Sequence, residues 1–121
     1  MADEIRVEGL LLRAIIGING EERRDRQDVL IDLVLFVDTT TAGRTDEIAD
    51  APVNYRTLTK RIISRVEASE FHLIERLAAE IAAICLEEPG VARVRVEVKK
   101  PGALRFADSV GIVIERGRDS G

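Results

Sequence analysis

The sequence has very few of the residues that build redox and metal sites. The 121-residue chain contains one cysteine, Cys85, and one histidine, His72. A single cysteine excludes a disulfide within the chain and is typical of a reducing compartment, so we expect a cytoplasmic protein. One cysteine and one histidine cannot together build a zinc site, which usually takes at least three protein ligands. We therefore expect neither a bound metal nor a disulfide. We expect Cys85 and His72 to have structural roles.

Excess positive charge and long apolar runs are also missing. The net charge is -4, which argues against non-specific nucleic-acid binding, because that binding needs a basic surface. No apolar run approaches the ~20 residues of a membrane span. The N-terminal MADEIRVEGL lacks a basic segment followed by an apolar one, so no secretory signal is expected. GxSxG, P-loop and GxGxxG motifs are absent, which leaves serine acyl transfer and nucleotide binding without sequence support.

The residues that are present predict one folded domain over 1–121. Apolar residues make up 45% of the chain and charged residues 33%, which is typical of a globular protein of this length. Apolar patterning predicts strands over 4–16, 28–38, 93–99 and 108–116. Helical spacing predicts helices over 55–70 and 73–87, and the segment 39–52 is expected to be a long connection.

The predicted order of elements is β-β-α-α-β-β. Its simplest arrangement is an α+β fold in which both helices cover one face of a four-stranded antiparallel sheet. The strand over 28–38 carries apolar side chains on both faces, because Leu30, Val34 and Phe36 lie opposite the main apolar face. An apolar second face suggests self-association, since a small two-layer domain leaves that face uncovered.

Three polar clusters and one helical acid are candidate functional residues. The first cluster is the loop that contains Glu22 and Gln27, and the second is Asn54 with Tyr55, the only tyrosine. Each has a structural alternative: a solvated charged turn for the loop, and a helix N-cap followed by a packed aromatic for Asn54 and Tyr55.

The remaining candidates are Lys99-Lys100 and Glu75. The lysines could simply end a strand, and Glu75 could be a first-turn acid favoured by the helix dipole. Taken together, an amine, a phenol and carboxylates can move protons without a metal or cofactor. A buried carboxylate also suits a flat amino-substituted heterocycle, because two parallel N–H donors match its two oxygens. Glu75 lies at the edge of an apolar stripe, so we expect it to be buried and satisfied by such a ligand or by water.

Five segments in order resemble the dihydroneopterin aldolases and the related dihydroneopterin triphosphate 2′-epimerases. These segments are Gly17 with Glu22 and Gln27, DEIADAPVNY, LIERLA, KPGA and VGIVIER. The resemblance spans about residues 5–116. It implies the tunnelling fold, in which the ββααββ unit forms a ring of four subunits, with two rings usually stacked into an octamer and active sites between neighbours.

The resemblance also implies roles for individual residues around a pterin substrate. Glu75 would anchor the amino-pyrimidine edge, and Lys100 would transfer protons around the ring. Tyr55 would reach in from the neighbouring subunit, and Glu22 would lie near the substrate side chain. Backbone contacts would come from Leu73, Ile74, Val53 and Asn54.

The implied reaction, a step in folate biosynthesis, is a retro-aldol cleavage to 6-hydroxymethyl-7,8-dihydropterin and glycolaldehyde, with no Schiff base, metal or cofactor. If glycolaldehyde turns over and re-adds, the 2′ centre is inverted. GINGEERRDRQDV, NYRTLTKRII and ALRFADSV are more similar to the epimerases, whereas KPGA and VGIVIER are more similar to the aldolases. We favour the aldolase, with the triphosphate epimerase as the alternative and a non-catalytic pterin-binding protein as a third reading.

A triphosphate substrate would need cations near its phosphates. The candidates, which could equally be exposed surface charges, are Arg23, Arg24, Arg26, Lys60 and Arg61. Zinc-dependent relatives of the same fold, GTP cyclohydrolase and pyruvoyl-tetrahydropterin synthase, are disfavoured because they need Cys/His clusters.

Overall fold

A computed structural model describes residues 2–20 and 23–118 of the chain. Its elements, in chain order, are β1 (Asp3–Ala14), β2 (Gln27–Val37), α1 (Thr40–Thr45), the 3₁₀ turn η2 (Ile48–Asp50), α2 (Tyr55–Glu67), α3 (Ile74–Leu86), β3 (Arg93–Pro101) and β4 (Ser109–Gly117). Within these ranges no helix is both long and apolar enough to cross a membrane.

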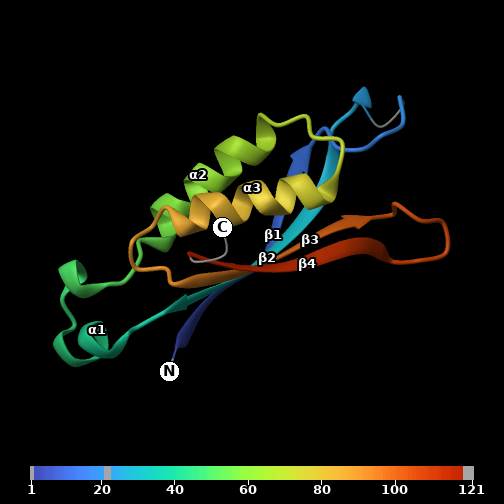
Figure 1. Cartoon of the computed structure of the whole chain (residues 1–121). Helices are drawn as coiled ribbons and strands as arrows, with labels where there is room; N and C mark the ends of the chain where they lie inside the picture. The colour runs from blue at the N-terminus through green and yellow to red at the C-terminus, as the bar shows by residue number, and fades with distance from the viewer. Residues whose placement is uncertain (1, 21–22, 119–121) are drawn as a thin grey trace.

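The four strands form one antiparallel sheet in the order β1-β2-β3-β4. Helices α2 and α3 lie together on one face of this sheet, while α1 lies beyond its end, near the N-terminus (Figure 1). The predicted α+β arrangement, with two helices on one face, is therefore confirmed.

The core lies between the sheet and the helix pair, and strand alternation decides which side chains enter it. On β2, Ile31, Leu33 and Leu35 are buried, whereas Val34 and Phe36 on the opposite face are only partly buried. Successive side chains point to opposite faces of a strand, so this pattern is the one expected when helices cover one face. Charged side chains of β1, β2 and β3 share the opposite face, among them Arg6, Glu8, Asp32, Arg95 and Glu97.

The two main helices each bury one stripe. Leu58, Ile62 and Val66 are the buried residues of α2, which is the 3.6-residue spacing of one helix face. The predicted N-cap is confirmed, because the Asn54 side chain accepts a hydrogen bond from the Thr57 N–H at 3.1 Å. The buried stripe of α3 consists of Leu77, Ala78, Ile81, Ala82, Ile84 and Cys85.

The structure differs from the sequence expectations in several places, and one of them is the end of α2 at Glu67 rather than at residue 70. Strand β1 ends at Ala14 rather than at residue 16, although Ile16 is still buried. The predicted connection 39–52 contains α1 and η2, neither of which has a buried residue, so no apolar periodicity marked them. Strand β3 continues to Pro101, so Lys100 is a paired strand residue, opposite Val110.

Candidate functional site

A pocket of about 410 Å³ opens where the N-terminus of α3, the ends of β3 and β4, and the segment after β1 meet. Four of the predicted site residues line it together: Leu73, Ile74, Glu75 and Lys100. The other lining residues are Gly17, Ile18, His72, Val110, Gly111 and Ile112. We call this cavity the Glu75 pocket.

Glu75 stands in the first turn of α3, and its side chain is exposed to solvent. The expectation that it is buried was wrong for the isolated chain, because the inward stripe of α3 begins only at Leu77 and Glu75 lies beside the pocket instead. Leu73 precedes the helix without a side-chain cap. The first N–H groups of a helix have no partner inside the helix, so this end of α3 offers donors and a carboxylate side by side.

Lys100 is one of the few polar residues in the interior, with 8% of its surface exposed. The period of two along β3 places it on the helix-covered face, in line with Val94, Val96 and Val98. Its aliphatic stem continues the apolar row, and the row ends where the Glu75 pocket begins. A lysine whose stem is packed in this way has its amine confined beside the pocket that it lines.

Three more of the predicted residues line a second pocket, of about 560 Å³, at the N-terminus of α2. Val53, Asn54 and Tyr55 share it with Ile48, Ala51 and Arg56. Val53 is buried, but Tyr55 has 59% of its surface exposed, so it is not the packed aromatic of the structural alternative. The linings of the two pockets have no residue in common. One chain therefore keeps Tyr55 apart from Glu75 and Lys100.

Glu22, the remaining predicted catalytic residue, lies outside the described residues. Of the five candidate cations, three are engaged within the chain. Arg23 and Arg26 donate to backbone carbonyls, and Arg61 pairs with Glu87 and Glu88. Arg24 and Lys60 are exposed, and neither lines one of the two pockets.

Sequence reasoning missed six residues that line the Glu75 pocket. The sequence predicts a structural role for His72, but the residue is exposed and lines the pocket. Val110 and Gly111 enter the site through strand register, because they pair with Lys100 and Lys99. If the strand predicted over 93–99 were extended by two residues, the hairpin would close at Pro101 and Ser109. That closure fixes the register and so pairs Lys100 with Val110 and Lys99 with Gly111.

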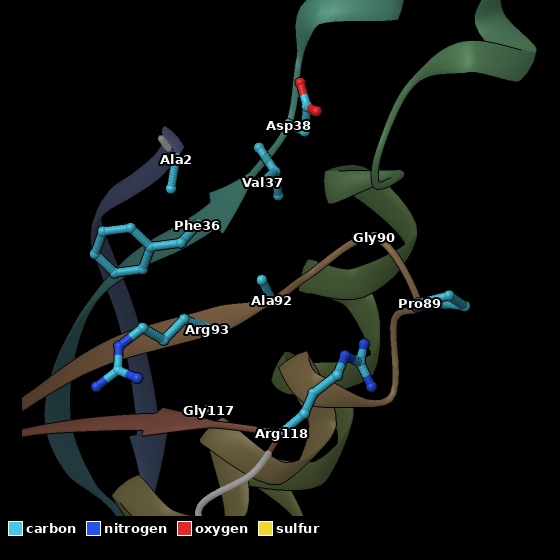
Figure 2. Close-up of a pocket in the computed structure, with 10 residues that line it drawn as sticks. All are labelled: Ala2, Phe36, Val37, Asp38, Pro89, Gly90, Ala92, Arg93, Gly117 and Arg118. Atoms are coloured by element: carbon cyan, nitrogen blue, oxygen red, sulfur yellow. The ribbon is translucent and has the colours of Figure 1, made fainter.

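A third cavity, of about 480 Å³, lies at the opposite end of the sheet and contains none of the predicted residues. Figure 2 shows that the guanidinium groups of Arg93 and Arg118 lie on different sides of it and do not converge. Arg93 pairs with Glu115 at 3.1 Å, and Arg118 donates to the Glu88 carbonyl. Across residues 2–20 and 23–118, no group of three or more His, Cys, Asp or Glu side chains could hold a metal ion.

Comparison with known proteins agrees with this architecture. The family model described as FolB, dihydroneopterin aldolase, matches residues 5–115. The dihydroneopterin triphosphate 2′-epimerase of Pseudomonas aeruginosa is 47% identical over 110 residues, which are 91% of this chain and 89% of that protein.

Solved structures agree as well. The FolB protein of Vibrio cholerae superposes with a TM-score of 0.93 at 32% identity, covering 98% of this chain and 99% of that one. The dihydroneopterin aldolase of Escherichia coli, crystallised with neopterin, gives a TM-score of 0.89 at 33% identity, covering 95% and 99%. A family match over nearly the whole chain, supported by these relatives, shows that the chain belongs to the dihydroneopterin aldolase (FolB) family.

Proposed function

We propose that this protein is a 7,8-dihydroneopterin aldolase of folate biosynthesis that also epimerises its substrate. The observation that carries the proposal is the Glu75 pocket, where a carboxylate, the N-terminal backbone of α3 and the confined amine of Lys100 border one cavity. These are the groups needed to hold a flat amino-heterocycle and to move protons beside it.

Glu75 binds the substrate in this proposal. Its two carboxylate oxygens accept parallel hydrogen bonds from the ring N–H and the exocyclic amino group of the pterin. The backbone at Leu73 and Ile74 contacts the same edge of the ring. The exposed carboxylate fits this role, because an exposed group is free to meet a ligand and is desolvated only when the ligand arrives.

The reaction breaks the bond between the first and second carbons of the substrate side chain. The 2′-hydroxyl loses its proton, glycolaldehyde leaves, and the bonding electron pair moves into the imine of the dihydropterin ring. The resulting enamine is reprotonated to 6-hydroxymethyl-7,8-dihydropterin. Lys100, Tyr55 and Glu22 carry the proton transfers. The substrate's own imine accepts the electrons, so the step requires no metal, cofactor or Schiff base.

The proposal includes a homo-oligomer with sites between subunits. Tyr55, Val53 and Asn54 line a pocket separate from the one that holds Lys100. A ring in which the second pocket of one subunit meets the Glu75 pocket of its neighbour brings the two groups together. We propose a ring of four such subunits, stacked in pairs as an octamer. Each chain contributes one pterin-binding domain over 1–121, in the cytoplasm.

The alternative activity is that of a dihydroneopterin triphosphate 2′-epimerase. It is favoured by the 47% identity to the Pseudomonas aeruginosa protein of that name. The second pocket also contains Arg56, an exposed cation next to Tyr55. The engagement of Arg23, Arg26 and Arg61 within the chain removes three of the five cations first considered for a triphosphate.

Chromatography of the products from 7,8-dihydroneopterin and from its triphosphate tests the proposal. We expect glycolaldehyde and 6-hydroxymethyl-7,8-dihydropterin from dihydroneopterin, with some 2′-epimer. Epimer of the triphosphate without glycolaldehyde from either substrate would establish the epimerase instead. Binding of neopterin without turnover of either substrate would leave only a pterin-binding protein.

A further inference from the structure

One guanidinium joins two backbone segments that both contribute to the wall of the Glu75 pocket. The first segment follows β1 and carries Gly17 and Ile18. The second is the connection between α2 and α3, which carries His72 and Leu73. Arg23 donates to the Gly17 carbonyl at 3.3 Å and thus holds the first segment.

The same side chain also holds the second segment. Arg23 Nη1 donates to the Phe71 carbonyl at 3.3 Å, and Nη2 donates to the Glu70 carbonyl at 2.7 Å. The Gly17 N–H reaches the Phe71 carbonyl directly at 3.3 Å. In Figure 1 the blue segment after β1 lies beside the turn between α2 and α3, as these contacts require. Three carbonyls on two segments therefore converge on one side chain.

Phe71, whose carbonyl accepts from Arg23, also contacts side chains of α2 and α3. The guanidinium groups of Arg65 on α2 and Arg76 on α3 lie 5.3 and 5.6 Å from the centre of the Phe71 ring. Glu80 pairs with both of them, at 3.0 and 3.3 Å. These contacts hold the Phe71 ring against side chains of both helices, so a hydrogen bond to the Phe71 carbonyl links the Gly17 segment to the helix pair.

We propose that Arg23 is a positioning residue that fixes the relative position of two segments in the wall of the Glu75 pocket. It does not line the pocket, and it acts through the carbonyls of Gly17, Glu70 and Phe71. The guanidinium serves three acceptors from two nitrogens, because Nη1 donates to Gly17 and Phe71 and Nη2 donates to Glu70. A lysine has one donor nitrogen, so it would lose at least one of these contacts. This inference rests on the proposed pterin site.

Arg26 provides a matched comparison. It lies in the same loop and also donates to backbone carbonyls, those of Arg13 at 3.3 Å and Glu67 at 2.6 Å. None of these residues lines the Glu75 pocket. Arg26→Met therefore removes a similar tie between the loop and the end of α2 without touching a wall of the pocket, and it reports the purely structural cost of such a loss.

The experiment compares wild type, Arg23→Met, Arg23→Lys and Arg26→Met. Calorimetry gives the Kd for neopterin, kinetics with dihydroneopterin give kcat and KM, and melting gives Tm. We expect Arg23→Met to raise Kd and KM about tenfold with little change in kcat, since charged hydrogen bonds are lost at the wall and not at the reacting atoms. Arg23→Lys should give Kd and KM values between those of wild type and of Arg23→Met. Arg26→Met should lower Tm while leaving Kd unchanged.

Hydrogen exchange of the unliganded protein gives a readout that needs no ligand. We expect faster exchange of the amides at 17–18 and 71–75 in Arg23→Met, and not in Arg26→Met. Unchanged Kd and exchange in Arg23→Met, or an equal rise of Kd in both Met variants, would overturn the positioning role. Should Arg23→Met not fold, Arg23→Lys decides by the same measurements. A wild type that does not bind neopterin would contradict the proposed function, and the exchange data would still decide the role of Arg23.

Discussion

Adding one methyl group at Gly90 should destabilise the protein, because the turn after α3 lies directly against Pro52. A Cβ at this position would lie 1.8 Å from the Pro52 carbonyl oxygen and 2.7 Å from its carbonyl carbon. Both are backbone atoms, so no side-chain rotation can relieve the overlap. Moving the oxygen out to 3.0 Å requires a shift of about 1.2 Å in a packed turn.

Overpacking of this kind costs about 1–3 kcal/mol. For a chain of 121 residues the entropy of unfolding converts that cost into a fall in Tm of about 4–12 °C. Val53, Asn54 and Tyr55 follow Pro52 directly, so the shift should also displace the second pocket. We therefore expect Gly90→Ala to lower turnover as well as Tm.

The matched control is Gly43→Ala. Gly43 lies in α1, and a Cβ there would meet no atom within 4 Å. A helical glycine replaced by alanine gains about 0.5–1 kcal/mol, so Tm should rise slightly. Melting curves at equal protein concentration compare the two variants, because oligomers melt in a concentration-dependent way. A Gly90→Ala protein that melts within a degree of wild type would refute the close approach of the two segments.

Further predictions concern Asn54, Cys85, and Tyr55 together with Lys100. Asn54→Ala should lower the free energy of unfolding by about 1 kcal/mol in a denaturant titration, because the Thr57 N–H loses its cap, and an unchanged midpoint would contradict that role. Burial raises the pKa of the Cys85 thiol from 9.0 to about 12. The folded protein therefore keeps a proton that the unfolded chain loses, so this contribution to stability should fall as pH rises from 9.0 towards 12. Cys85 should also resist maleimide at pH 8 until denaturant is added, and labelling of the native protein would contradict its burial. When the Tyr55→Phe and Lys100→Met proteins are mixed in equal amounts and refolded together, the mixed oligomers should recover about a quarter of wild-type activity. Each site would combine two subunits, so about a quarter of the sites would receive an intact Tyr55 and an intact Lys100. No recovery on mixing would contradict sites shared between subunits.

Much of the fold follows from periodicity in the sequence. The alternation of Val94, Val96 and Val98 predicted a strand with one buried face, and the apolar spacing after Asn54 predicted a capped helix; both are confirmed. The resemblance to dihydroneopterin aldolases is confirmed by the family match over residues 5–115. Segments without an inward face left no such pattern, so α1 and η2 were missed.

Site geometry was less predictable, because it depends on contacts between distant segments. Lys100 continues the buried row of β3. Its burial was not predicted, because a charged residue at this position breaks the apolar alternation in the sequence. Glu75 was expected to be buried, but the inward stripe of α3 begins at Leu77. The tie from Arg23 to Phe71 joins residues 48 positions apart, and an arginine in a polar loop carries no local signal of that partner.

The separate roles of Glu75 and Lys100 are the central claim of the proposed function. Two variants separate them: Glu75→Gln removes the charge of the carboxylate, and Lys100→Met removes the amine while filling the buried space of the lysine stem. The decisive measurement is the Kd for neopterin together with the single-turnover rate on dihydroneopterin. We predict that Glu75→Gln weakens binding at least about tenfold. We predict that Lys100→Met binds nearly as wild type but cleaves about 10²–10⁴-fold more slowly. Equal weakening of binding in both variants, with the rate per bound substrate unchanged, would contradict the account.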